Sequence, residues 1–170
     1  LTEYDLLLFY DMYDSITHAQ KQAYIDLIET GKPMIFLHHS LVSYQDWPEF
    51  RAIVGGKYHT LDSTRLSHYK HDESISVKVE DPQHPITYGM SDFTIEDETY
   101  GNCEILPGVT PLLRTDHPLS MPVIGWVNHY RQHPIVYLQG GHGPTAYRDP
   151  HFQKILKNAI HWSLRKENAN

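Results

Sequence analysis

The sequence predicts an α/β fold in which one domain, residues 1–170, is built around a mostly parallel sheet. The segment Tyr4 to Tyr10 is apolar nearly throughout, as strands buried on both faces of a parallel sheet are. A helical pattern and a second apolar segment, Met34 to Leu37, follow it, and this order predicts a right-handed crossover between parallel strands. The length of 170 residues and the hydrophobic content of 40% suit one globular core.

The first helix has both of its ends marked in the sequence. Thr17 and Gln20 have the spacing of a capping box, in which each side chain accepts a bond from the other residue's main-chain N–H. Apolar residues then recur at helical spacing, and Gly31 supplies the stop. A second, shorter helix is predicted over residues 45–54, before the glycine pair 55–56.

The middle of the chain predicts short strands. Residues 57–73 are polar and rich in histidine, which predicts a loop with one short strand. Residues 74–79 alternate apolar and polar side chains, as a half-exposed strand does. The final helix is predicted to begin with Asp149 as its cap and Pro150 at its first position. Further strands are predicted over residues 104–106, 110–114, 123–127 and 134–138.

The predicted sheet begins unusually early in the chain. A doubly wound sheet rarely starts with so central a strand at residue 5, so we expect that the strand–helix segment that opens such a fold is missing here. A sheet edge left open in this way is a surface for strand pairing. Association into a homo-oligomer is therefore an expectation from the sequence.

Composition narrows the classes of ligand. The formal net charge is −7, and no cluster of Lys and Arg supplies the positive surface that nucleic acids require. No apolar stretch approaches the roughly 18 residues of a membrane span, so neither a nucleic acid nor a membrane is an expected partner. The 12 Tyr and 13 His suit a small sugar-like ligand, because such side chains combine flat faces with polar tips. No signal peptide opens the chain, and the compartment stays open, with the cytoplasm slightly favoured.

Polar side chains stand where predicted strands end. His38-His39 directly follows the strand of residues 34–37, Glu98 follows the segment 92–95, and His142 lies in a Gly-Gly-His-Gly turn after the strand of residues 134–138. The carboxyl ends of parallel strands meet at one edge of a sheet, and ligands bind there in open α/β folds. These groups are therefore expected to converge, while the sequence leaves open whether one or both of the paired histidines reach the site.

Two chemistries fit such a group. His39, Glu98 and His142 are the candidate catalytic residues, with His38, Ser40 and Tyr100 as substrate-binding residues. Two histidines and a carboxylate could hold a divalent metal, zinc above all, with one position open to water or substrate. A metal-free acid–base pair of His and Glu fits equally well. The alternative without function is that His38 packs in the core and Glu98 caps a loop.

Other catalytic motifs are missing from the sequence. No Gly-x-Ser-x-Gly elbow is present, and Ser40 lacks flanking glycines, so a serine hydrolase is not expected. Cys103 is the single cysteine and is interpreted as a structural thiol. Neither a Gly-x-Gly-x-x-Gly sequence nor a Walker loop occurs, which disfavours nucleotide binding.

Several segments together resemble the trehalose-utilization (ThuA-like) family. They are residues 31–40, 84–90, 97–100, 122–127, 141–143 and 158–162, in the family's order over nearly the whole chain. The resemblance implies a class I glutamine amidotransferase-like fold, a flavodoxin-like three-layer sandwich with a mostly parallel sheet. It places His38-His39 near the position of the amidotransferase nucleophile, a cysteine in those enzymes, so glutaminase activity is not expected. One departure is the turn Tyr130 to Pro134, where the family tends to have a glycine-containing turn.

The resemblance also implies a function. The family is linked to the catabolism of trehalose, other disaccharides and keto-glycosides, so the expected ligand is a sugar or keto-sugar. The leading hypothesis is a sugar-processing hydrolase or isomerase that works through His and Glu. The alternative is a non-catalytic carbohydrate-binding or interaction module on the same scaffold, and the fold alone does not decide between them.

Overall fold

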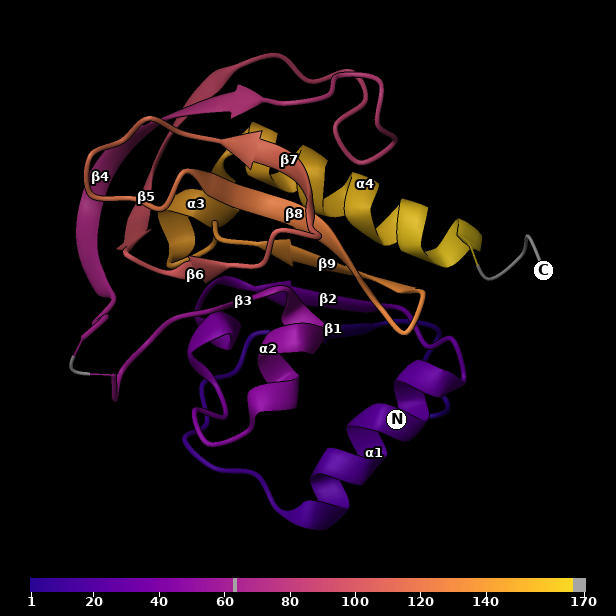
Figure 1. Ribbon diagram of the computed structural model, residues 1–170. Coiled ribbons are helices and arrows are strands. Elements are labelled where there is room, and N and C mark those ends of the chain that lie inside the picture. The colour runs from indigo at the N-terminus through magenta and orange to yellow at the C-terminus, as the bar shows by residue number, and fades with distance from the viewer. Residues whose placement is uncertain (63, 167–170) are drawn as a thin grey trace.

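The computed structural model describes residues 1–62 and 64–166 as one α/β unit with seven strands in its main sheet (Figure 1). The helices are α1 (His18–Glu29), α2 (Pro48–Val54), α3 (Pro144–Arg148) and α4 (Pro150–Lys166), with a 3-10 turn η1 (His38–Val42). The strands are β1 (Leu7–Phe9), β2 (Met34–Leu37), β3 (Gly56–Lys57), β4 (His68–Val79), β5 (Phe93–Gly101), β6 (Glu104–Ile105), β7 (Thr110–Arg114), β8 (Val123–Tyr130) and β9 (His133–Leu138). None of the described helices combines the length and the apolar content that crossing a membrane requires.

The main sheet is mixed, and the prediction of a mostly parallel sheet is wrong. Its strand order is β1-β2-β9-β8-β7-β4-β5, and only the pairs β1–β2 and β2–β9 are parallel. The pairs from β9 to β5 are antiparallel. The physical reason lies in the length of the connections between strands. A parallel pair needs a long crossover, usually a helix, whereas strands joined by short turns run antiparallel. Between α2 and α3 the chain forms strands and turns, and the described residues there include no helix.

Helices cover both faces of the sheet. On one face, Phe9 of β1 stacks on Phe36 of β2, and these rings meet Tyr24 of α1 and Phe50 of α2. On the other face, Phe152 and Ile155 of α4 close against residues of the central strands. Figure 1 shows α4 behind the sheet and α2 in front of it. The three-layer arrangement that was expected is therefore present, around a sheet of different topology.

The local signals of the first half of the chain are confirmed. Thr17 and Gln20 form the capping box at the start of α1, and Gly31 follows its end with φ +80°. Strand β2 has the predicted bounds, and so does β7. The first strand is shorter than predicted, with Leu7–Phe9 in place of residues 4–10. The sequence did not reveal α3, which begins directly after the Gly-Gly-His-Gly turn.

Strands β4 and β5 form an arm that leaves the sheet. Residues 57–73 were predicted as a loop with one short strand, whereas β4 begins at His68 as a long strand and pairs with β5 as far as Gly101. Only Lys78 and Val79 of β4 pair with β7, so the rest of the arm is two-stranded. A bulge between Lys70 and Glu73 increases the twist of this arm. Figure 1 shows the arm curling past the ends of β2 and β9, which brings β5 to the carboxyl edge of the sheet.

The two-residue turn between β8 and β9 predicts a stabilising substitution. Arg131 and Gln132 have φ values of +47° and +70°, a conformation that favours Gly at both positions. Arg131 pairs with Glu29 and Glu49, so Gln132 is the position to change. We expect Gln132→Gly to raise the free energy of unfolding by about 0.5 kcal/mol, because relief of left-handed strain exceeds the added chain entropy. Urea denaturation measures this change in the free energy of unfolding. Gln132→Ala, which keeps the Cβ, is the control and should not raise the free energy of unfolding.

Candidate functional site

Three side chains from distant parts of the chain meet at the carboxyl edge of the sheet. His38 directly follows β2, Glu98 belongs to β5, and His142 follows β9. Glu98 Oε2 lies 2.9 Å from His38 Nε2 and 3.0 Å from His142 Nδ1. The two histidine nitrogens are 3.2 Å apart. We call this group the His–Glu–His centre.

His38 is held in a strained conformation by its neighbours. Its φ is +49°, in the left-handed region that residues other than Gly rarely adopt. Tyr137 Oη donates to its carbonyl oxygen at 2.9 Å, and the side chain is fully buried. Strain of this kind concentrates at functional sites, where the surrounding structure enforces it.

A main-chain carbonyl determines which nitrogen of His38 carries a proton. His38 Nδ1 lies 2.8 Å from the carbonyl oxygen of Gln139. A carbonyl can only accept, so Nδ1 must donate, and Nε2 of the neutral ring has a lone pair. That lone pair faces Glu98 Oε2, and Tyr100 Oη donates to it at 3.0 Å. Burial is the main cause that raises the pKa of Tyr100, so this phenol stays protonated and able to donate.

Glu98 is a buried carboxylate surrounded by histidines. Its side chain is only 5% exposed. Its pKa lies below its ordinary value: burial raises the pKa, but the hydrogen bond with His38 and the charges that His38, His142 and His71 carry when they are protonated outweigh burial. His71 Nδ1, on β4, lies 3.1 Å from Glu98 Oε1. Glu98 is therefore ionised at neutral pH.

When His38 is neutral, two acceptors, His38 Nε2 and Glu98 Oε2, face each other without a proton between them. Tyr100 donates to the single lone pair of His38 Nε2, and a neutral His142 can donate to Glu98, but no described residue places a proton between His38 Nε2 and Glu98 Oε2 while His38 is neutral and Glu98 is ionised. A proton shared by the two groups or a metal cation would resolve the contact. Within the described residues, these are the three side chains whose ligand atoms all lie within 4.8 Å of one another and could hold a metal.

The structure separates the predicted site residues into two sets. His38, Glu98, His142 and Tyr100 come together. His39 does not join the centre, because its Nδ1 lies 3.3 Å from the carbonyl oxygen of Asp11 and its ring lies against Tyr10. Burial and the charge of His38 lower the pKa of His39. Its predicted place in the ligand set is taken by His38.

Ser40 lies outside the centre too. Its hydroxyl donates to the carbonyl oxygen of Phe9 at 3.0 Å and accepts from the main-chain N–H of Asp11 at 3.3 Å. These bonds tie the turn after β2 to the segment after β1. Ser40 therefore holds these two loops together. Its expected role in substrate binding stays a prediction.

Asp97 is a residue of the site that the sequence placed at a strand end beside Glu98 without assigning it a role. Its buried carboxylate accepts from the main-chain N–H of Glu98 at 2.9 Å, of Gly141 at 2.8 Å and of His142 at 3.0 Å. Gly141 has φ +107°, and a Cβ there would lie 3.0 Å from Phe152. Asp97 therefore holds the Gly-Gly-His-Gly turn against β5. The only signal in the sequence was its position beside Glu98.

Cys103 and the cavity beside β1 lie apart from the centre. Cys103 is buried after β5, and burial raises the pKa of its thiol to about 12, which suits a structural residue. A cavity of about 380 Å³ lies between β1 and α1, lined largely by apolar side chains. It includes Tyr10, which also contacts His142. The described residues that line the cavity contain no group of ligand atoms comparable to the His–Glu–His centre.

Comparison with solved structures identifies the fold. A ThuA-like protein from Parabacteroides merdae superimposes with a TM-score of 0.81 at 16% identity, covering 96% of this chain and 71% of that one. A ThuA-like protein from Bacteroides uniformis gives 0.73 at 21% identity, covering 95% and 69%. The β-galactosidase from Rahnella sp. R3 gives 0.63 at 13% identity, over 95% of this chain but only 23% of that enzyme. The fold resembles that of the class I glutamine amidotransferase-like group.

The family assignment comes from the sequence match. A family model described as trehalose utilisation (ThuA) matches residues 1–163, which is nearly the whole chain and includes all three residues of the His–Glu–His centre. A separate search of curated proteins found no match to this chain. The chain belongs to the ThuA family.

Proposed function

We propose that this chain is a carbohydrate-processing enzyme whose His–Glu–His centre holds a divalent cation, with zinc as the cation that fits best. The observation that carries the proposal is the contact of His38 Nε2 with Glu98 Oε2 at 2.9 Å, two groups that both present lone pairs when His38 is neutral. A cation between them would turn an unfavourable contact into two ligand bonds.

The donor set supports zinc. Two imidazole nitrogens and one carboxylate oxygen form one of the ligand sets of catalytic zinc, which keeps a fourth position for water or substrate. His38 donates its other ring N–H to a main-chain carbonyl, and this is the usual way in which a metal-binding histidine is oriented. His142 is 44% exposed, so the centre is accessible from solvent on that side.

The neighbouring residues have roles that follow from their contacts. Bound zinc would supply Lewis acidity for a carbonyl oxygen or lower the pKa of a water molecule. Tyr100 Oη lies 3.0 Å from His38 Nε2 on the buried side, and because that nitrogen has one lone pair, a bound cation would replace this hydrogen bond. His71 bonds to the outer oxygen of Glu98 from the exposed arm, and so holds the carboxylate in place. Asp97 fixes the main chain of both Glu98 and His142.

The link to carbohydrate comes from the family and from the surroundings of the centre. The ThuA family is described by trehalose utilisation. Side chains that are half exposed and aromatic lie beside the centre, among them Tyr10 and Tyr147. The same aromatic side chains favour the second candidate, a carbohydrate-binding module without catalysis. Hydrolysis of a glycosidic bond, or isomerisation next to a keto-sugar carbonyl, is the chemistry that distinguishes the enzyme from the module.

Metal titration tests the proposal. We expect wild-type protein to bind one equivalent of Zn²⁺ by calorimetry, and Co²⁺ to give a visible absorption band. His38→Ala, Glu98→Gln and His142→Ala should each lower zinc affinity by about 100-fold or more. His39→Ala is the matched control, because His39 adjoins His38 but lies outside the centre, and it should bind zinc as wild type does.

Two results would contradict the metal centre. One is wild-type protein that binds no divalent cation, and the other is a loss in His39→Ala as large as that in His38→Ala. Incubation of zinc-loaded protein with trehalose and with 3-keto-trehalose, followed by NMR, tests catalysis. Binding without conversion of either sugar would favour the module, whereas conversion that Glu98→Gln abolishes would support the enzyme.

A further inference from the structure

The cavity between β1 and α1 has the features of a second binding site. Its volume is about 380 Å³, which is enough for a small molecule. Asp11, which follows β1, is the only charged side chain among the residues that line it. Five of the lining residues are aromatic and supply most of its walls, namely Phe9, Tyr10, Tyr13, Tyr24 and Tyr44. We call this space the Asp11 cavity.

The carboxylate of Asp11 is held in place by neutral groups. Tyr44 Oη donates to Asp11 Oδ2 at 3.1 Å. Ser40 Oγ lies 3.2 Å from Asp11 Oδ1, but its single proton is shared with the carbonyl oxygen of Phe9 at 3.0 Å. Burial is the main cause that raises the pKa of Tyr44 to about 12, so this phenol is uncharged at neutral pH. These bonds therefore orient the carboxylate without neutralising its charge.

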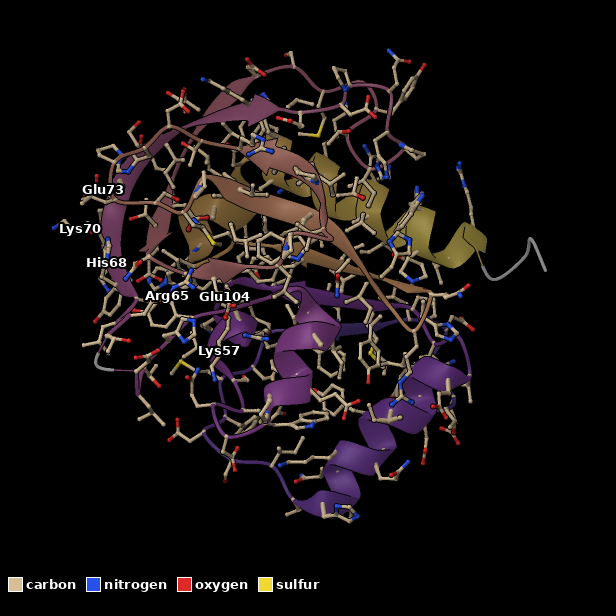
Figure 2. The ribbon with its side chains drawn as sticks, in the orientation of Figure 1. Lys57, Arg65, His68, Lys70, Glu73 and Glu104 are labelled. Atoms are coloured by element: carbon tan, nitrogen blue, oxygen red, sulfur yellow. The ribbon has the colours of Figure 1, made fainter. Side chains whose placement is uncertain are left out.

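The protein also supplies no basic side chain to this carboxylate. No Lys or Arg among residues 1–62 and 64–166 forms an ion pair with Asp11. Lys57 and Arg65 donate instead to main-chain carbonyl oxygens. Figure 2 shows both on the β4 side of the molecule, with α2 between them and α1 in this view. The Asp11 cavity consequently has a negative potential, to which the net charge of −7 adds.

The aromatic walls add to the attraction for positive charge. The face of an aromatic ring carries the negative part of its quadrupole and attracts a cation that lies over it. Tyr10 is 40% exposed and Tyr13 is 63% exposed, so solvent reaches the cavity beside these two rings. Phe9 and Tyr24 stack with their ring centroids 5.3 Å apart and supply apolar surface. A ligand with a positive group and an apolar body matches both kinds of surface.

We propose that the Asp11 cavity binds a small organic amine, whose ammonium group pairs with Asp11 and whose apolar body packs against the aromatic side chains. This site is separate from the proposed function, because Asp11 contributes no atom to the His–Glu–His centre. Tyr10 connects the two places, since it lines the cavity and its hydroxyl donates to the carbonyl oxygen of His142 at 3.0 Å.

A series of probes that differ in charge tests this inference. Benzylamine, benzyl alcohol and benzoate share one ring and are positive, neutral and negative at pH 7. Each is titrated into wild-type protein and followed by ligand-observed NMR, with EDTA present so that no divalent cation binds the amine. We expect benzylamine to bind at least about 10-fold more tightly than benzyl alcohol, and benzoate to bind more weakly than either.

Two substitutions of aspartate locate the positive group. Asp11→Asn keeps an acceptor for Tyr44 but removes the charge, so benzylamine should bind about 10-fold more weakly and lose its advantage over benzyl alcohol. Asp14→Asn is the matched control, because it removes the same charge from an exposed residue of the same loop that does not line the cavity. Its affinity for benzylamine should equal that of wild-type protein.

A larger side chain on α1 tests the cavity itself. Ala23 lines the Asp11 cavity and is exposed on α1, so Ala23→Phe should fold and occupy part of the space. We expect it to weaken benzylamine and benzyl alcohol alike, by about 10-fold. Ala19→Phe, one turn earlier on α1 and outside the lining residues, is the matched control and should leave both affinities unchanged.

Several results would overturn the inference while leaving the metal centre as it stands. They are wild-type protein that does not bind benzylamine, a neutral or negative probe that binds as tightly as benzylamine, and Asp11→Asn protein that binds like Asp14→Asn. Sedimentation of wild-type protein tests the other occupant of such a cavity, a second copy of the chain. A dimer that Ala23→Phe dissociates and Ala19→Phe does not would assign the cavity to that interface, against the inference.

Discussion

Asp97→Ala lowers the free energy of unfolding by about 4 kcal/mol and weakens zinc binding roughly 10- to 100-fold. The carboxylate accepts from three main-chain N–H groups, of Glu98, Gly141 and His142. Its removal leaves buried donors unpaired, at roughly 1–3 kcal/mol each, with partial recovery by water. The same bonds orient Glu98 and His142, and loss of such outer contacts typically weakens a metal site by this factor. Urea denaturation and calorimetric zinc titration measure the two effects.

Two further variants show whether Asp97 acts on the centre specifically. Asp97→Asn keeps one acceptor but turns an amide N–H₂ toward a main-chain donor, so we expect a loss of about 2 kcal/mol. Asp149→Ala is the matched control, because Asp149 accepts from the main-chain N–H groups of His151 and Phe152 at the start of α4. Its loss should cost about 1 kcal/mol and leave zinc affinity unchanged. If Asp97→Ala binds zinc like wild type, Asp97 supports the fold but not the centre.

Gly55→Ala lowers the free energy of unfolding by about 3 kcal/mol. Gly55 ends α2 with φ +88°, where a side chain costs roughly 1–2 kcal/mol. A Cβ there would also lie 2.8 Å from Val109 Cγ1 and 2.9 Å from Asn128 Cβ, and overpacking adds roughly 1–3 kcal/mol. Asn128 cannot move freely, because its Nδ2 donates to the carbonyl oxygens of Ala52 and Ile53 at 2.7 and 2.8 Å. Urea denaturation measures the loss.

Two other glycines separate strain from crowding. Gly31 has φ +80°, but no described atom lies within 4 Å of the place that a Cβ would take, so Gly31→Ala should cost only about 1 kcal/mol. Gly108 has neither a positive φ nor a close neighbour among the described residues, and Gly108→Ala should have little effect. Equal losses in Gly55→Ala and Gly31→Ala would mean that the contacts with Val109 and Asn128 add nothing.

The sequence predicted that polar residues near strand ends would meet, but it did not predict which of them form the His–Glu–His centre. His38 and His142 follow β2 and β9, which are adjacent parallel strands, so their meeting follows from the strand-end rule. Glu98 lies within β5, on an antiparallel arm at the far edge of the sheet, and reaches the centre because the arm curls over. Glu98 does meet the two histidines, as expected, but the prediction that it lies at a strand end is wrong, because it lies within β5.

Whether His38 or His39 joins the centre depends on the backbone conformation at the end of β2, which the pattern of apolar residues does not reveal. The backbone leaves β2 with φ +49° at His38, so the alternation of the strand no longer determines side-chain directions there. The stretch that contains His71 was predicted as a loop with one short strand, because the first half of β4 is polar and exposed and has no apolar period. The pairing of β4 with β5 on both sides of the bulge makes this stretch part of a long strand.

By itself, the sequence determined the elements whose signals lie within a few residues. The capping box of α1, the glycine stops after α1 and α2, the buried strand β2 and the Asp149-Pro150 start of α4 are local, because backbone bonds and side-chain caps act over one turn of chain. Only the tertiary structure decided the mixed sheet, the curled arm of β4 and β5, and the replacement of His39 by His38 in the centre. These depend on which distant segments pair, and the free energy of such pairing is shared among residues far apart in the chain, such as His38 and His142, which are 104 positions apart.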